Sequence, residues 1–283
     1  MLPAVSPTTW SNARHSVEIT GARFAELLLS VPSEAMATVD WTVADTAAHL
    51  VTISDAYRRM LGKSGSLSES PVIAEVIPRT TVDTVAQFND VALAQLTERD
   101  VRTLAGRLRE DIAAIQRACD DLDPDEPIDW LGGSRVPAAG VLAHLVNEMQ
   151  VHGRDIARAT GTRWAILPAD AALFFELFLL GVTRHGYGHL LDWNRPEHRG
   201  RVAVEFRSAY TSPAVMVLDN GRVSIGHPGR DIDVKVRFDP VYLNLMLFGR
   251  VSRARAALTG KIVVWGRRPW LLPVFMRKMR LPS

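Results

Sequence analysis

Hydrophobic positions recur with the 3.6-residue period of amphipathic helices from the first residues to about Leu191. Residues 62–78 interrupt this pattern and are expected to be a loop, because they are rich in Ser, Gly and Pro. Thr42 and Asp45 have the spacing of a capping box, and Gly161 is a typical C-terminal stop signal. The predicted helices cover residues 16–29, 42–61, 82–122 with a break near Asp100, 137–160 and 170–187.

Beyond Arg201 apolar and polar positions alternate, which is typical of β-strands. Asn220 and Gly221 separate two apolar runs and predict a hairpin, because both accept the positive φ angles of a type I′ turn. Strands are expected at 201–207, on both sides of this turn within 215–225, at 232–238 and at 261–266, with short helices after Asp239 and Ser252. This mixture indicates a small α+β domain.

The two patterns together predict an α + (α+β) chain, with a helix-bundle domain over residues 1–191 and an α+β domain over 192–283. The single cysteine, Cys119, excludes an internal disulfide and is expected to be a buried, inert thiol. No signal peptide is expected, and the apolar run 171–182 is shorter than the about 20 residues that span a bilayer. We therefore expect a cytoplasmic protein.

The net charge of +2 hides an asymmetry, because nine basic residues and no acidic residue follow Asp239. Such a tail attracts anions, but it lacks the density and the motifs of a nucleic-acid arm, so no nucleic-acid partner is expected. Residues 265–280 mix aromatic, aliphatic and basic side chains. They could lie on an anionic membrane surface, although a terminal helix packed on its own domain is favoured.

Candidate chemistry is concentrated in the predicted helix 137–160, where His144, Glu148 and His152 recur every four residues and share one face. His49 lies in the second turn of the predicted helix 42–61. A catalytic metal needs about three protein donors and one open position. His49, Glu148 and His152 would supply two imidazoles and one carboxylate, which suit zinc and also nickel, iron or manganese.

His144 is an alternative third ligand, but His144 and His152 are separated by roughly 12 Å along one helix at about 1.5 Å per residue, too far for one ion. His49 is therefore preferred, and His144 is expected to line the pocket or to face another helix. The competing interpretation is that these histidines are ordinary hydrogen-bonded structural residues. Asp155 is expected either to orient His152 or to pair with a neighbouring arginine of the same helix.

Residues 41–50, around His49, and 147–157, around Glu148 and His152, resemble the mycothiol-dependent maleylpyruvate isomerase family. The N-terminal domain of that family is a DinB-like four-helix bundle in which the matching histidines and glutamate bind zinc. The resemblance therefore implies a zinc site at His49, Glu148 and His152. Residues 231–236, 256–261 and 264–266 look like parts of a sterol-carrier-protein-type domain.

The resemblance further implies a metal that activates the sulfur of a low-molecular-weight thiol, such as mycothiol, in a transferase or isomerase. In the isomerase the thiol adds to a carbon–carbon double bond, allows rotation and leaves. His144 would contact this cofactor. Arg222, Arg230 and Arg250 are candidates for holding a dicarboxylate, because a guanidinium fork suits carboxylates, although each could be a solubilising surface residue. The implied partners are the thiol and a small anionic or electrophilic substrate.

Two other functions are compatible with the sequence. The sterol-carrier-like domain could bind a lipid or acyl chain in an apolar pocket, with the helical domain as its scaffold and no catalysis. The metal could also be purely structural, in which case it would have no open coordination position.

Overall fold

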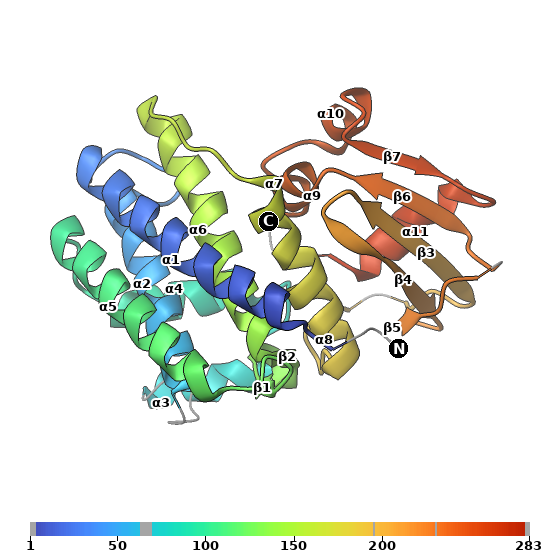
Figure 1. The fold of residues 1–283 in the computed structure, drawn as a ribbon, viewed down its shortest axis with the longest axis horizontal. Coiled ribbons are helices and arrows are strands. Elements are labelled where there is room, and N and C mark those ends of the chain that lie inside the picture. The colour runs from blue at the N-terminus through green and yellow to red at the C-terminus, as the bar shows by residue number, and fades with distance from the viewer. Residues whose placement is uncertain (1–3, 63–69, 195, 230, 281–283) are drawn as a thin grey trace.

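The computed structural model describes residues 4–62, 70–194, 196–229 and 231–280. It consists of a helical N-terminal region followed by a C-terminal region built on a sheet (Figure 1), which confirms the predicted order of a helical part and an α+β part. Within the described residues, no helix is both long enough and apolar enough to cross a membrane.

Among the described residues, the helical part is built on four long helices: α1 (Pro7–Ser30), α2 (Val43–Leu61), α5 (Val101–Ala118) and α6 (Ala138–Thr160). α1 and α2 each pack against both α5 and α6, around a continuous hydrophobic core. The predicted boundaries are confirmed at three places. Thr42 forms a capping box with Asp45, Asp100 caps α5, and Gly161 closes α6 with φ 70°.

The prediction that the first helix begins at residue 16 is wrong, because α1 begins nine residues earlier, at Pro7. The Ser6 hydroxyl accepts a hydrogen bond from the backbone N–H of Thr9, and proline suits the first helical position. Cys119 follows α5 and is buried, and burial raises the pKa of its thiol to about 11, in agreement with the predicted inert thiol.

Residues 63–69 of the stretch predicted to be a loop lie outside the described residues, and the rest of that stretch also contains regular structure. A short helix, α3 (Pro71–Val76), and a 3₁₀ turn (Ile77–Arg79) lie there, because a proline again occupies the first helical turn. α4 (Val85–Gln95) follows. A small antiparallel hairpin of β1 (Pro127–Asp129) and β2 (Arg135–Pro137), which the sequence pattern did not indicate, precedes α6.

The helix predicted over 170–187 joins the two parts of the molecule. It consists of α7 (Pro168–Leu173), a π-helical turn (Phe174–Leu179) and α8 (Leu180–His185). This segment lies between the helical part and the sheet (Figure 1). The Phe174 ring lies 6.1 Å from that of His144 in the helical part, whereas the Phe175 ring lies 5.3 Å from that of Phe206 in the sheet. Neighbouring residues of one turn therefore contact the helical part and the sheet.

The sheet has the strand order β5-β4-β3-β6-β7. Neighbouring strands are antiparallel, except that β3 and β6 run parallel. Asn220 and Gly221 have φ angles of 46° and 82° at the turn between β4 and β5, which confirms the predicted hairpin. The strands are β3 (Arg201–Ser208), β4 (Thr211–Asp219), β5 (Arg222–Gly226), β6 (Val234–Phe238) and β7 (Ile262–Trp265).

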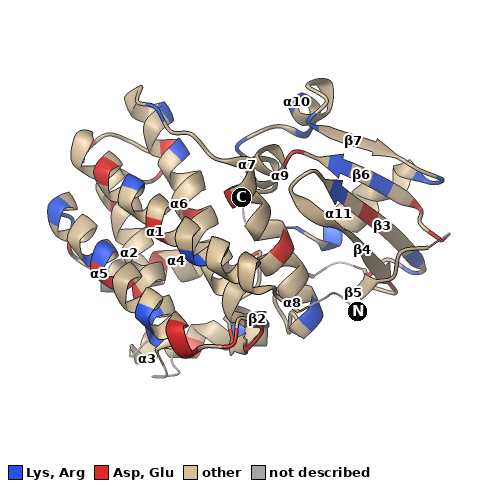
Figure 2. Cartoon of the chain, in the orientation of Figure 1, with Lys and Arg blue, Asp and Glu red and all other residues tan. Residues whose placement is uncertain are grey.

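In the described part of the C-terminal region, three α-helices accompany the sheet: α9 (Pro240–Leu247), α10 (Arg253–Leu258) and α11 (Leu272–Lys278). Asp239 caps α9, as predicted. In α11, the buried ring of Phe275 lies 6.0 Å from that of Phe206, so the terminal segment packs on its own part of the chain, as favoured from the sequence. Basic residues of this region lie on β3 and β6 (Figure 2).

Candidate metal centre

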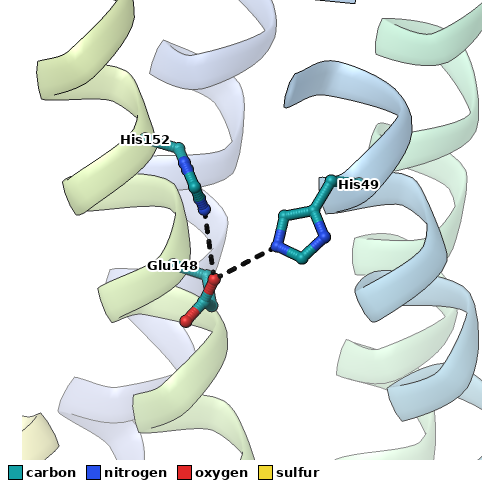
Figure 3. A group of neighbouring side chains, drawn as sticks. All are labelled: His49, Glu148 and His152. Carbon is teal, nitrogen blue, oxygen red and sulfur yellow. Dashed lines mark ion pairs between the residues drawn. The ribbon is translucent and has the colours of Figure 1, made fainter. Parts of the chain in front are cut away.

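The centre brings together His49 from α2 with Glu148 and His152 from α6 (Figure 3). His49 lies in the second turn of α2, whose start is set by the Thr42 cap, and α2 packs against α6. Glu148 and His152 are one turn apart and therefore point the same way. One donor atom from each of the three residues can be chosen so that all lie within 4.8 Å of one another.

The distances within this triad favour a metal site over a hydrogen-bonded cluster. Nε2 of His49 and Nε2 of His152 lie 3.5 and 3.4 Å from the same oxygen, Oε2 of Glu148. A usual N–H···O bond has a donor–acceptor distance of about 2.7–3.2 Å, which is shorter. Two donors that bind one zinc ion tetrahedrally at about 2.1 Å each lie roughly 3.4 Å apart. The donor set and its spacing therefore fit a divalent transition metal.

Electrostatics favour the protonation states that bind a metal. Burial lowers the pKa of His49 and outweighs the raising effect of Glu148, so the His49 ring is neutral near pH 7. Burial would raise the pKa of Glu148, but its contacts with the two histidines outweigh this effect and keep that pKa well below its usual range. A neutral imidazole and an ionised carboxylate are the ligand forms that metal binding requires.

Asp155 lies behind the triad, on the far side of His152. Nδ1 of His152 is buried and has no hydrogen-bond partner among the described residues, and Oδ2 of Asp155 lies 3.8 Å from it. Arg250 donates to this same oxygen from Nε at 3.1 Å and from Nη2 at 2.8 Å. Among the described residues, Asp155 thus forms its close ion pair with Arg250 from the C-terminal region, whereas Arg154 of α6 interacts with it only at longer range. The position of Asp155 also suits orientation of the His152 ring.

His144 is held at the edge of the centre by a chain of hydrogen bonds. Nε1 of Trp130 donates to the Tyr57 oxygen over 3.3 Å, and Nδ1 of His144 lies 2.9 Å from that oxygen. If the Tyr57 hydroxyl donates to Nδ1, the His144 proton is on Nε2, which lies 3.6 Å from Oε1 of Glu148. Burial lowers the pKa of His144, so the ring remains a neutral N–H donor.

A cavity of about 1610 Å³ adjoins the centre and is lined by all three triad residues and by His144. The Trp41 ring lies 4.7 Å from that of His49 and 6.0 Å from that of His152, and it forms one wall. Sequence reasoning did not assign a role to Trp41, Tyr57 or Trp130. Trp41 could have been found from the sequence, because it lies beside the Thr42 cap of the helix that carries His49. Tyr57 and Trp130 are brought to the site only by tertiary packing.

The candidate arginines are placed differently from one another. Arg250 lines the cavity, but its guanidinium also donates to Asp155 and to the backbone oxygen of Phe248. Arg222 is exposed at the start of β5 and is not part of the cavity lining. Arg230 lies outside the described residues. Of the candidates that the structure describes, it therefore brings only Arg250 to the centre, and a role in binding a dicarboxylate stays a prediction.

The fold and the centre define a helical protein with a buried site of two histidines and one glutamate, extended by an α+β region. Residues 19–157, which contain the whole triad, match the family model described as the mycothiol maleylpyruvate isomerase N-terminal domain. Through residues 19–157, the chain is therefore similar to the N-terminal domain of the mycothiol maleylpyruvate isomerase family. No curated protein sequence matches the chain.

Solved structures extend the similarity to most of the chain. The crystal structure of the mycothiol-dependent maleylpyruvate isomerase aligns over 93% of this chain and 93% of that chain, with a TM-score of 0.51 and 12% identity. A histidine-to-alanine mutant of that isomerase gives a TM-score of 0.52 with the same coverage and identity. At this identity the similarity is one of fold. Apo sterol carrier protein 2 from Yarrowia lipolytica aligns over 24% of this chain and 62% of that protein's chain at 20% identity. The TM-score of 0.20 is too low to indicate a common fold.

Proposed function

We propose that this protein is a metal-dependent enzyme that uses a low-molecular-weight thiol such as mycothiol, as an isomerase or a transferase. The observation that carries the proposal is the convergence of His49, Glu148 and His152 within 4.8 Å at the wall of a large cavity. Zinc is the proposed ion, with nickel, iron or manganese as alternatives. A divalent ion bound there would lower the pKa of a thiol in contact with it and so supply a thiolate near neutral pH.

The residues of the chain would have distinct tasks in this reaction. The triad would hold the ion, and the cavity beyond it would receive the thiol and the second substrate. In the tautomer that accepts from Tyr57 at Nδ1, His144 would donate a hydrogen bond from Nε2 to an oxygen of a bound molecule beside Glu148. The rings of Trp41 and Trp130 line the cavity and would keep bulk water from the reacting atoms.

Within this proposal, the four packed helices are the core of a DinB-like four-helix bundle over residues 1–191, and residues 192–283 form the second domain. The family match and the mutual packing of α1, α2, α5 and α6 support the first assignment. A lipid-binding function for the second domain is not favoured. The cavity between α11 and the sheet, lined by Phe206 and Phe275, has a volume of about 30 Å³, which is too small for an acyl chain.

Metal content tests the proposal first. Purified wild-type protein should contain about one transition-metal ion per chain by mass spectrometry, and His49→Ala and His152→Ala should lose most of it, because two donors rarely suffice for tight binding. His189→Ala is the matched control, because this side chain is 74% exposed and does not line the cavity. Full metal content in both triad variants would contradict the proposed centre.

Thiol dependence tests the second half of the proposal. Metal-loaded protein should accelerate mycothiol addition to an electrophilic double bond, and His49→Ala should remove this acceleration. Two results would contradict the proposed enzyme. One is that the electrophile is consumed at the same rate without added thiol, and the other is that the rate of addition is undiminished in His49→Ala.

A further inference from the structure

The wall of the cavity next to the triad is aromatic. The ring centroids of Phe178 and Trp130 lie 4.7 and 5.2 Å from that of His144, and that of Phe174 lies 6.1 Å from it. Nε2 of His144 lies 3.6 Å from Oε1 of Glu148. His144 thus lies between the aromatic rings and Glu148, a proposed metal ligand. A molecule that reacts at the metal would therefore lie close to the aromatic wall.

The apolar surface continues beyond these rings. Phe248, whose ring lies 5.6 Å from that of Phe174, also lines the cavity, as do Leu131 and Leu190. At about 1610 Å³ the cavity exceeds the roughly 300–1,000 Å³ of most small-molecule sites, so it has room for a thiol and a second ligand together. Covering this apolar surface with an apolar ligand removes it from water, which favours binding.

Apart from the proposed metal ion, the charged side chains around the cavity do not favour an anion. Among the described lining residues, carboxylates outnumber arginines. Of the arginines, Arg250 is engaged by Asp155, while Arg107 and Arg158 are exposed to solvent. The basic residues on β3 and β6 (Figure 2) do not line the cavity. The lining carboxylates are Asp40, Asp55, Asp90, Glu110, Asp111, Glu148 and Asp155, and the lining arginines are Arg107, Arg158 and Arg250.

We propose that the electrophile of this enzyme is an uncharged molecule with an aromatic or similarly apolar body, bound against Trp130, Phe174 and Phe178, and not a small dicarboxylate. An α,β-unsaturated ketone with an aryl substituent represents the class. This inference rests on the proposed function for its chemical step. In that step the thiol sulfur bonds to the β-carbon, the carbon–carbon π bond breaks, and the proton released by the thiol is taken up at the α-carbon through solvent.

Binding can be measured without the thiol reaction. Benzylacetone is an unreactive, uncharged probe, and its para-carboxylate differs from it by one charge. Calorimetric titration of the zinc-loaded full chain should show benzylacetone binding at least tenfold more tightly than the para-carboxylate, because a carboxylate pays desolvation against an aromatic wall and finds no uncommitted buried arginine there. Equal or tighter binding of the para-carboxylate, or no measurable binding of benzylacetone, overturns the proposal.

Variants of the wall locate the binding. Phe178→Ala should weaken benzylacetone binding about three- to tenfold and leave the para-carboxylate unaffected, because an aromatic contact is removed. Phe178→Leu keeps an apolar side chain and serves if the alanine variant does not fold; it should weaken binding in the same direction. Trp270→Ala is the control, because Trp270 is 68% exposed and lies outside the cavity lining. Unchanged binding in both folded Phe178 variants overturns the assigned wall.

A reactive pair separates this inference from the proposed function. Zinc-loaded protein with mycothiol should accelerate addition to benzylideneacetone at least tenfold more, in kcat/KM, than addition to its para-carboxylate. Equal acceleration of both supports the thiol function and overturns the substrate class. Selective binding of benzylacetone with no acceleration of either addition supports the pocket and overturns the thiol function.

Discussion

The two nitrogens of His152 have different surroundings. Nε2 faces Glu148 at 3.4 Å, whereas the buried Nδ1 faces Asp155 at 3.8 Å and has no hydrogen-bond partner among the described residues. When Nε2 binds an ion, the ring proton must be on Nδ1, and a carboxylate on that side stabilises this tautomer. Arg250 holds the carboxylate in place from the C-terminal region.

We therefore expect Asp155→Asn to weaken zinc binding about 10- to 100-fold without removing a ligand, since the orienting carboxylate is lost. A zinc titration against a chelator of known affinity measures this change. Asp239→Asn is the control, because Asp239 pairs with Lys261 and lies outside the cavity lining. Zinc affinity that is unchanged in Asp155→Asn would remove Asp155 from the description of the centre.

At this scale the sequence predicted the triad and a supporting role for Asp155, but not the pairing of Asp155 with Arg250. Glu148 and His152 are visible because four-residue spacing places side chains on one helix face, and His49 because it lies on a separate, well-capped helix. Arg250 and Asp155 are 95 residues apart, and no local pattern relates them. Their pairing depends on how the C-terminal region docks on α6.

At the scale of elements, the helix α6, which carries Glu148 and His152, packs closely against the loop that follows it. Gly153 follows His152 on α6, and a Cβ added there would lie 2.4 Å from a ring carbon of Trp164. This indole closes over the helix and donates a hydrogen bond from Nε1 to the backbone oxygen of Gln150 at 3.0 Å. A glycine at this position thus lets the loop after α6 pack directly on the helix.

Gly153→Ala should accordingly destabilise the protein by about 1–3 kcal/mol, because the added methyl group overpacks this contact. Gly106→Ala is a matched control in α5, where a Cβ would meet nothing within 4 Å. It should stabilise the protein by roughly 0.5–1 kcal/mol through helix propensity alone. Urea unfolding of both variants measures the difference, and equal effects of the two substitutions would contradict the packing argument.

Elements with strong local signals were predictable, and elements defined by packing were not. The Thr42 capping box and the Asn220-Gly221 turn depend on residues close in sequence, and both are present in the structure. The π-helical turn at Phe174–Leu179 and the β1–β2 hairpin have weak local signals. The π-helical turn belongs to the segment between α6 and the sheet, and β2 packs against α8 of the same segment.

At the scale of the molecule, the two regions share one core. Phe175 lies 4.9 Å from Phe238 between ring centroids, and Nδ2 of Asn244 in α9 donates to Oδ1 of Asn147 in α6 over 3.0 Å. Buried residues of both regions belong to one continuous hydrophobic cluster. The helix and strand patterns predicted a helical region and an α+β region, but not that the two regions would share one hydrophobic core.

The shared core predicts a single unfolding transition. Urea denaturation followed by circular dichroism and by tryptophan fluorescence should give coincident curves, and Phe175→Ala should shift both equally, by about 3–5 kcal/mol. Thr259→Ala in the loop after α10 is an exposed control that should leave the midpoint nearly unchanged. Two separated transitions would show that residues 1–191 and 192–283 unfold independently.

The most direct test of the central claim is anomalous X-ray diffraction from crystals of the zinc-loaded protein. We expect one strong zinc peak about 2.0–2.2 Å from Nε2 of His49, Nε2 of His152 and a carboxylate oxygen of Glu148, with a non-protein atom completing the coordination. A peak at another place, or none among these three side chains in crystals of protein that carries about one zinc per chain, would contradict the account.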